Sequence, residues 1–169
     1  MSQSPPLAAS QPAQLKSDYG VYSVFEQLLF ALPGGDGKRA VAFFARDSAN
    51  PSDRNLIEAY ADGGLTVLAP FASRPNDKLS IAFGYSKLSS AAQALDNDYR
   101  VLTGSDRPVR NYGGLLTVGY LAELRKGWIV LPNAQYVIHP GGGYVLDAGG
   151  VPHAVRDAFV LGLRSVVKF

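Results

Sequence analysis

Seven segments of this sequence alternate apolar residues with polar or small residues, and this alternation limits the possible folds more than any other feature. A period of two is typical of β-strands that have two different faces. Most of the segments have about 9–15 residues, whereas strands of soluble sheets usually have about five or six. Strands that cross a bilayer at a tilt need about 9–11 residues, so the lengths favour membrane-spanning strands. The segments span residues 19–32, 39–47, 56–69, 78–88, 111–125, 128–138 and 155–169.

The alternation alone does not say which face of the sheet points outward. In segment 78–88, Leu79 and Ile81 alternate with Ser80 and Ala82. A soluble β-sandwich or a lipocalin-like binding protein would turn the apolar face toward its core. A porin would turn it toward lipid and the polar face toward a wet lumen. Both hypotheses are consistent with the pattern. In segment 19–32 both faces are mostly apolar, so the sequence does not show which of them would face lipid.

The connections between segments alternate in length. The gaps 89–110 and 139–154 are long, whereas 126–127 is a tight turn and the others are short. Outer-membrane barrels have long loops at one end and short turns at the other, and the same rhythm is predicted here. The residues from Ser90 to Leu95 favour a turn of helix inside the first long gap. A helix over 56–61 is the alternative for the third segment.

Composition excludes several functional classes. The 169-residue chain contains no Cys, which removes disulfides, thiolate zinc sites and cysteine nucleophiles. Its two His residues cannot build a His-rich metal cluster. A formal net charge of +2 offers no strong electrostatic capture of nucleic acid. Residues 1–18 are rich in Pro, Ser, Gln and Ala and predict a flexible lead-in, without the basic and apolar regions of a signal peptide.

Several local sequences, in their order along the chain, resemble the carbohydrate-selective porin family of the OprB type. The last segment, with AFVLGLR from Ala158 and an aromatic residue at Phe169, resembles the closing strand of outer-membrane barrels. The resemblance covers about residues 19–169. The local sequences that carry it are NPSDRN from Asn50, YADGGL from Tyr60, SRPND from Ser73, AFGYS from Ala82 and LPNAQYVIHPGG from Leu131.

This resemblance implies an all-β fold, the antiparallel transmembrane β-barrel, of which residues 19–169 form the C-terminal part and residues 1–18 a lead-in. The whole barrel would have about sixteen strands. The implied function is a porin of the cell outer membrane for passive transport of small sugars, with no enzyme activity, cofactor, metal or nucleic-acid partner. The implied partners are the lipid bilayer and sugars. Because bacterial barrels have even strand numbers, the missing N-terminal half or further copies of the chain would complete the wall.

Polar and aromatic residues on the predicted lumen faces are the candidate sugar-binding residues. Sugar hydroxyls need donors and acceptors, and an aromatic ring suits the apolar face of a sugar. For each residue the structural alternative is pairing with a neighbour to stiffen the wall. A hydrolase is the third hypothesis, but two carboxyls four residues apart on a strand lie about 13 Å apart, too far for a glycosidase pair. The candidates are Arg46, Glu58, Tyr60, Asp62, Asn133, Gln135 and Arg164.

Aromatic residues near the segment ends predict two belts at the membrane interfaces. Tyr85, Tyr112 and Tyr136 would approach the outer interface, at the end with the long loops. Trp128 and Phe169 would lie at the inner interface, beside the tight turn. Such belts are typical of outer-membrane barrels, because amphipathic rings favour the headgroup level.

Overall fold

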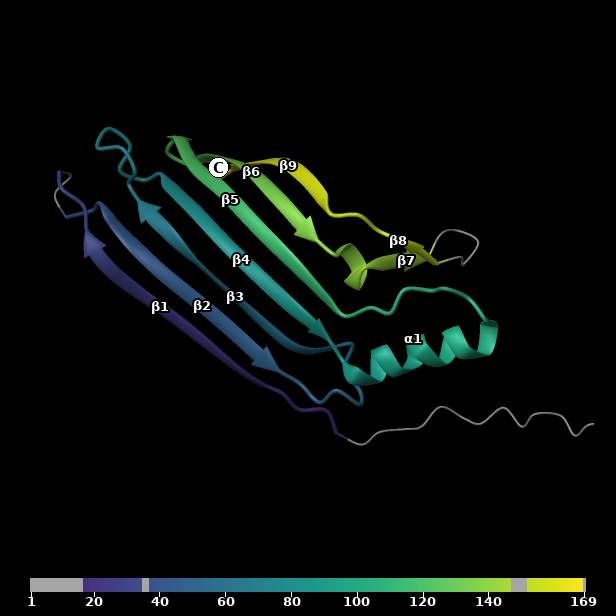
Figure 1. Ribbon diagram of the computed structural model, residues 1–169. Helices are drawn as coiled ribbons and strands as arrows, with labels where there is room; N and C mark the ends of the chain where they lie inside the picture. Colours follow the sequence, from purple (N-terminus) through teal and green to yellow (C-terminus); the bar gives the residue numbers. More distant parts are fainter. Residues whose placement is uncertain (1–16, 35–36, 147–151, 169) are drawn as a thin grey trace, which may run out of the picture.

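The computed structural model describes residues 17–34, 37–146 and 152–168, and within them seven strands form one antiparallel sheet (Figure 1). Each predicted segment supplies one strand, and the third is a strand, so the helix alternative over 56–61 is wrong. Apart from β9, which follows β6 in the sheet, the strands lie in chain order. They are β1 Val21–Ala31, β2 Ala40–Ala49, β3 Ile57–Leu68, β4 Lys78–Leu88, β5 Tyr112–Arg125, β6 Trp128–Ile138 and β9 Ala158–Val167.

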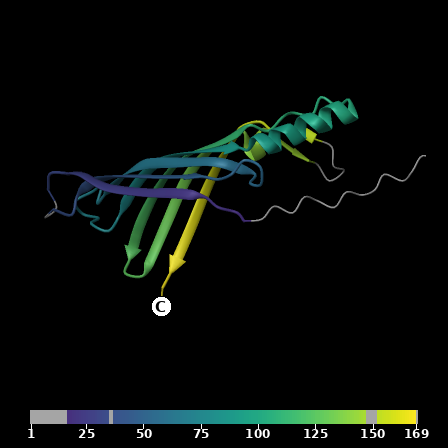
Figure 2. The same ribbon diagram turned by 90° about the horizontal axis from the view of Figure 1, so that it is seen from below.

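The sheet is curved and open. Figure 2 shows that β5, β6 and β9 bend away from the plane in which β1 and β2 run. Among the described residues, β1 pairs only with β2 and β9 only with β6. The curvature forms a trough, with one concave and one convex side, rather than two packed layers.

Short turns join the strands at one end of the sheet, and Arg39 links two of them. Its guanidinium donates hydrogen bonds to the carbonyl oxygens of Pro33 at 2.6 Å, Ala69 at 3.1 Å and Pro70 at 3.1 Å. The β1–β2 turn is thereby fixed to the β3–β4 turn. The β5–β6 turn has only two residues, and Gly127 takes a φ of 83°, which favours glycine.

Asp77 fixes the β3–β4 turn to β5 and is almost fully buried. Its carboxylate accepts hydrogen bonds from the Tyr120 hydroxyl, the Arg74 guanidinium and, at 3.0 Å, the backbone N–H of Glu123. Burial by itself raises the pKa of Asp77, but the hydrogen bonds from Arg74, Tyr120 and Glu123 outweigh it. The pKa of this carboxyl therefore lies below its usual value, and Asp77 is ionised at neutral pH.

Helix α1, Ser90–Thr103, lies in the first long connection, at the opposite end of the sheet. The Ser89 hydroxyl caps it by accepting a hydrogen bond from the Ala92 N–H at 3.2 Å, and Gly104 ends it with a φ of 63°. The predicted turn of helix is thus a helix of 14 residues. No described helix is long and apolar enough to cross a membrane.

The second long connection holds three short elements beyond the sheet: the 3-10 helix η1, Pro140–Gly142, and the strands β7, Tyr144–Leu146, and β8, Pro152–Ala154. The two strands pair with each other and not with the main sheet. The sequence pattern did not predict them.

A fully buried carboxylate, Asp96 on α1, joins the two long connections. It accepts hydrogen bonds from Arg110 Nε at 2.8 Å and from the Tyr144 hydroxyl at 2.8 Å, and Arg107 lies 3.4 Å away. Burial raises the pKa of Asp96, but the hydrogen bonds from Arg110 and Tyr144 outweigh it, so its pKa lies below the usual value. Asp96 therefore ties α1 to Arg107, Arg110 and Tyr144 at the end of the sheet with the long connections.

Candidate functional site

One face of the sheet is apolar and uncovered. The pairing register places residues from neighbouring strands directly opposite one another, so each row across the sheet shares one face. Ile81 is 48% exposed and Leu161 is 74% exposed, although both are large and apolar. A soluble sandwich would bury such a face against a second layer, and none is present among the described residues. One apolar row runs Phe43, Leu65, Ile81, Val118, Ala134 and Leu161.

The opposite face carries polar and small residues. In one row the hydroxyls of Thr66 and Ser80 are hydrogen-bonded at 2.9 Å. Glycines let the strands and side chains approach closely: a Cβ at Gly64 would lie 2.3 Å from the carbonyl oxygen of Ile81. This polar face is the candidate site. Across the sheet, the row that contains Thr66 and Ser80 consists of Ala42, Thr66, Ser80, Gly119, Asn133 and Gly162.

Arg46, Tyr60 and Asp62 lie together on the polar face. Arg46 Nε donates to Asp62 Oδ1 at 2.9 Å, and Nη2 donates to the other carboxylate oxygen. The Arg46 guanidinium lies 5.6 Å from the centroid of the Phe44 ring. Gly84 makes room here, because a Cβ there would lie 3.5 Å from the Tyr60 hydroxyl. The cluster offers an aromatic ring beside charged donors and acceptors.

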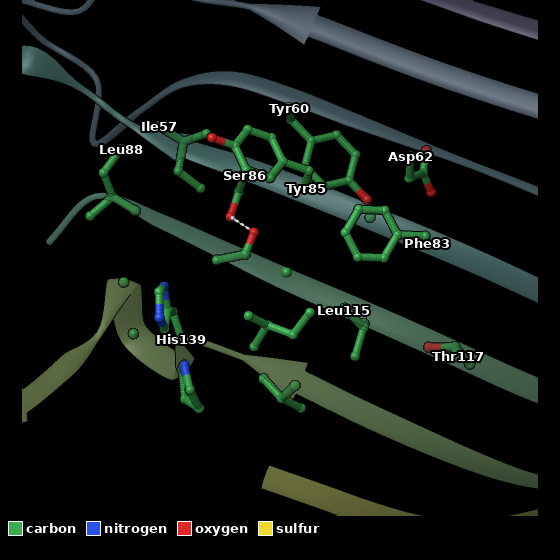
Figure 3. A pocket seen from close by; sticks show the side chains of 18 of the residues that line it. Ile57, Tyr60, Asp62, Phe83, Tyr85, Ser86, Leu88, Leu115, Thr117 and His139 are labelled. Carbon is green, nitrogen blue, oxygen red and sulfur yellow. Dashed lines mark hydrogen bonds between the residues drawn. The ribbon is translucent and has the colours of Figure 1, made fainter. Parts of the chain in front are cut away.

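A hollow of about 620 Å³ adjoins this cluster, toward the end with the long loops. In Figure 3, Tyr60 and Asp62 from β3 lie on one side of it and His139, which follows β6, lies on another. The His139 ring packs against the ring of Tyr112, with their centroids 4.3 Å apart. Its Nδ1 is buried and has no hydrogen-bond partner within the described residues. Sequence reasoning missed His139 as a wall residue, because it follows the last residue of a predicted strand.

A second hollow, of about 420 Å³, lies on the same face toward the short turns. Asn133 and Gln135 line it, and Gln135 Nε2 donates to Asn133 Oδ1 at 3.0 Å. Lys78 and Arg164 line it as well, and both are exposed. Neither cation has a hydrogen bond or ion pair to another described residue, so this part of the face is positively charged.

Glu58 lies apart from the other candidates. It sits where the β3–β4 register shifts, at the start of β3. Its carboxylate forms an ion pair with Lys87 at 2.6 Å and accepts a hydrogen bond from the backbone N–H of Ser90 at 3.1 Å. Glu58 and Asp62 therefore belong to different ion pairs. In the described part of the chain, no three His, Asp or Glu side chains gather to hold a metal ion.

The register also fixes the facing of β1, which the sequence left open. Glu26 lies opposite Phe44 and Val24 lies opposite Arg46, so both belong to the polar face. Phe25 lies on the apolar face, 6.1 Å from the ring of Phe43.

Aromatic residues gather at both ends of the apolar face. At the long-loop end, the rings of Tyr85 and Tyr112 stack with their centroids 5.6 Å apart. The Tyr136 hydroxyl donates a hydrogen bond to the Asp157 carboxylate at 3.1 Å. At the short-turn end, Trp128 Nε1 donates to the Ser165 hydroxyl at 3.0 Å. Tyr85, Tyr112, Tyr136 and Trp128 thus lie at the ends of the apolar face, and their membrane belts stay a prediction. Phe169 lies outside the described residues.

The family model of the carbohydrate-selective porins, OprB family, matches residues 2–169. The chain belongs to this family. Porin B of Pseudomonas aeruginosa is 28% identical over 162 residues, which cover 90% of this chain and 33% of that protein. The structure of OprB from Pseudomonas putida at high pH superposes with a TM-score of 0.78 at 23% identity, over 90% of this chain and 36% of that one.

These comparisons confirm the predicted fold class and the resemblance. The family consists of outer-membrane proteins, so the expected location is also confirmed. The chain spans about one third of the length of the relatives that it matches.

Proposed function

We propose that this chain forms part of the wall of an outer-membrane channel through which small sugars diffuse passively. The division of one curved sheet into an apolar and a polar face carries this proposal. Rows of exposed apolar side chains suit contact with lipid acyl chains, and the polar rows suit a water-filled lumen. Residues 19–169 are then the C-terminal part of a barrel, with residues 1–18 as a lead-in.

The polar face offers the chemistry that sugars in transit need. A sugar leaves part of its hydration shell in a narrow pore, and wall groups replace those hydrogen bonds. The Arg46–Asp62 pair supplies fixed donors and acceptors beside the Tyr60 ring. Asn133, Gln135 and Arg164 supply amides and a cation in the second hollow. Glu58 contributes at the outer mouth, near α1. Diffusion down a gradient needs no reaction step, and we propose a channel rather than an enzyme.

Sugar flux through the complete barrel in liposomes tests the proposal. Replacing Arg164→Ala should lower the swelling rate with small sugars by about tenfold, because one charged hydrogen bond contributes about 1.5 kcal/mol. Arg164→Lys is the matched control, since it keeps the charge and should retain most of the flux. Unchanged flux in both Arg164→Ala and Glu58→Ala would contradict the assignment of these side chains to the sugar path.

An open sheet cannot conduct, so the proposed channel needs a partner. Either the strands of a missing N-terminal half or further copies of this chain would close the wall.

A further inference from the structure

One row of the polar face changes from charged to apolar as it crosses the sheet. On β2 and β3 it holds Arg46 and Asp62, and on β4 it holds Gly84, which has no side chain. On β5 and β6 the register continues it with apolar residues. A charged pair and an apolar pair therefore share one row, with an open position between them. The whole row consists of Val24, Arg46, Asp62, Gly84, Leu115, Val137 and Ala158.

Leu115, in the apolar half of this row, is uncovered although it lies on the polar face. Its side chain is 38% exposed, and in Figure 3 it lies across the larger hollow from Tyr60 and Asp62. Leu88 lines the same hollow but is only 6% exposed, because η1 covers it: a Cβ at Gly142 would lie 3.0 Å from the Leu88 side chain. Exposed apolar groups bordered by polar ones are typical of binding surfaces. Leu115 is thus available to an apolar part of a ligand.

The charged half of the row keeps hydrogen-bonding capacity for a ligand. Arg46 uses Nε and Nη2 on the Asp62 carboxylate, and within the described residues its Nη1 has no hydrogen-bond partner. The Arg46 side chain is 55% exposed. Its free N–H groups, together with the Asp62 oxygens and the Tyr60 hydroxyl, suit the hydroxyls of a sugar.

The two halves are too far apart for one sugar ring to contact both. Neighbouring strands lie about 4.7–4.9 Å apart, so Asp62 on β3 and Leu115 on β5 are separated by about 10 Å across the sheet. A ligand that contacts both needs a polar end and an apolar end. The hollow of about 620 Å³ has room for such a molecule, since pockets for small molecules span about 300–1,000 Å³.

We infer that this hollow prefers small glycosides that carry an apolar aglycone, with the sugar at Arg46 and Asp62 and the aglycone over Leu115 and Val137. A free sugar satisfies the charged half and leaves the apolar half in contact with water. An apolar aglycone covers the apolar half, and the burial of its surface adds affinity. The exposed side chains of Leu56 and Ile57 also line the hollow and enlarge its apolar wall. The inference rests on the proposed function and specifies its class of substrate.

Block of the ion current through the complete barrel in a planar bilayer tests this preference. The probes are phenyl β-glucoside, methyl β-glucoside, which keeps the sugar but lacks the apolar ring, and phenol, which lacks the sugar. The wild-type channel should be half-blocked by phenyl β-glucoside at about a tenfold lower concentration than by either of the others, because it alone contacts both halves of the row.

Two variants of the apolar half and one control locate the effect. Leu115→Ser should reduce the tenfold preference for the phenyl glucoside to about twofold. Val137→Thr replaces a methyl group with a hydroxyl at nearly constant volume, so it tests the same wall with less risk to folding. Leu131→Ser is the matched control, because Leu131 lines the second hollow on the same face and should leave the preference unchanged.

Equal block by phenyl and methyl β-glucoside would overturn the inference, and so would block by phenol as strong as that by the phenyl glucoside. An equal loss of preference in Val137→Thr and Leu131→Ser would overturn it as well. Liposome swelling separates these results from the proposed function. Equal block in a barrel that sugars cross would contradict the inference alone. A preference for the phenyl glucoside in a barrel that neither sugars nor glucosides cross would support the binding site and contradict the proposed channel.

Discussion

Arg46 and Asp62 stand directly opposite each other on β2 and β3, and the guanidinium of Arg46 donates two hydrogen bonds to the carboxylate of Asp62. Asp62 is 9% exposed at its side chain, whereas Arg46 is 55% exposed. The carboxylate therefore serves as a buried anchor, and it holds the exposed guanidinium at one place on the polar face. A lumen wall built this way presents a cation whose charge is largely balanced.

Replacing Asp62→Asn should make the channel more selective for anions. The change leaves Arg46 without its counter-charge, and a fixed cation in a pore attracts anions. The reversal potential of the complete channel in a salt gradient measures this effect. Asp47→Asn is the matched control. Asp47 directly follows Arg46 on β2, so its side chain belongs to the opposite face of the sheet, where the Ser23 hydroxyl donates a hydrogen bond to it. Equal shifts of the reversal potential in the two variants would contradict the assigned facing.

Replacing Asp96→Asn should loosen the outer loops and leave the sheet intact. The neutral amide keeps the size of the side chain but loses the charge-assisted hydrogen bonds from Arg110 and from the Tyr144 hydroxyl. We expect a local loss of about 3 kcal/mol, which corresponds to about hundredfold faster hydrogen exchange in α1. Asp98→Asn, on the same helix but exposed, should change exchange little. Similar exchange in the two variants would contradict the anchoring role of Asp96.

The Asp77 carboxyl should titrate below its usual range, near the short turns. Its folded pKa lies below the unfolded value of about 3.9. Its stabilising effect is therefore complete above the unfolded pKa and is lost as the pH falls through the folded pKa. Carbon-13 NMR of the carboxyl in detergent measures the titration. Tyr120→Phe removes one donor and should move the midpoint upward, whereas a wild-type midpoint at or above the usual value would contradict this account.

Adding a methyl group at Gly64 should disturb the pairing of β3 with β4. The new Cβ would lie 2.3 Å from the Ile81 carbonyl oxygen and 2.9 Å from Ala82 Cβ, so the backbone must shift. Overpacking of this kind costs about 1–3 kcal/mol, which urea unfolding of the refolded barrel measures. Gly119→Ala is the matched control on the same face, where the nearest atom would be 3.8 Å away. Equal stability of the two variants would show that the close approach at Gly64 carries no cost.

The strand positions could be predicted because alternation is a local property. Ile81 and Ser80 differ in polarity wherever the strand lies, so the sequence alone shows two faces. The facing of β1 could not be predicted, because each of its faces mixes polar and apolar residues, as Glu26 and Phe25 show on the two sides. Only the pairing with β2, which brings Glu26 opposite Phe44, decides it.

Other parts of the site depended on details that periodicity does not carry. The partner of Glu58 depends on a register shift that brings Lys87 within reach, and no local pattern encodes that shift. The full length of α1 could have been predicted, since Ser89 is a typical N-cap and Gly104 a typical C-terminal residue. β7 and β8 have three residues each, too few to show a period.

The central claim is that the apolar face meets lipid and the polar face meets water in a lumen. Single cysteines along β4, in the complete barrel in membranes, test it most directly with a charged, water-soluble thiol reagent. The account predicts labelling at Ser80, Ala82, Gly84 and Ser86 and protection at Leu79, Ile81 and Phe83. Labelling of the apolar set with protection of the polar set, or labelling with no period of two, would contradict the account.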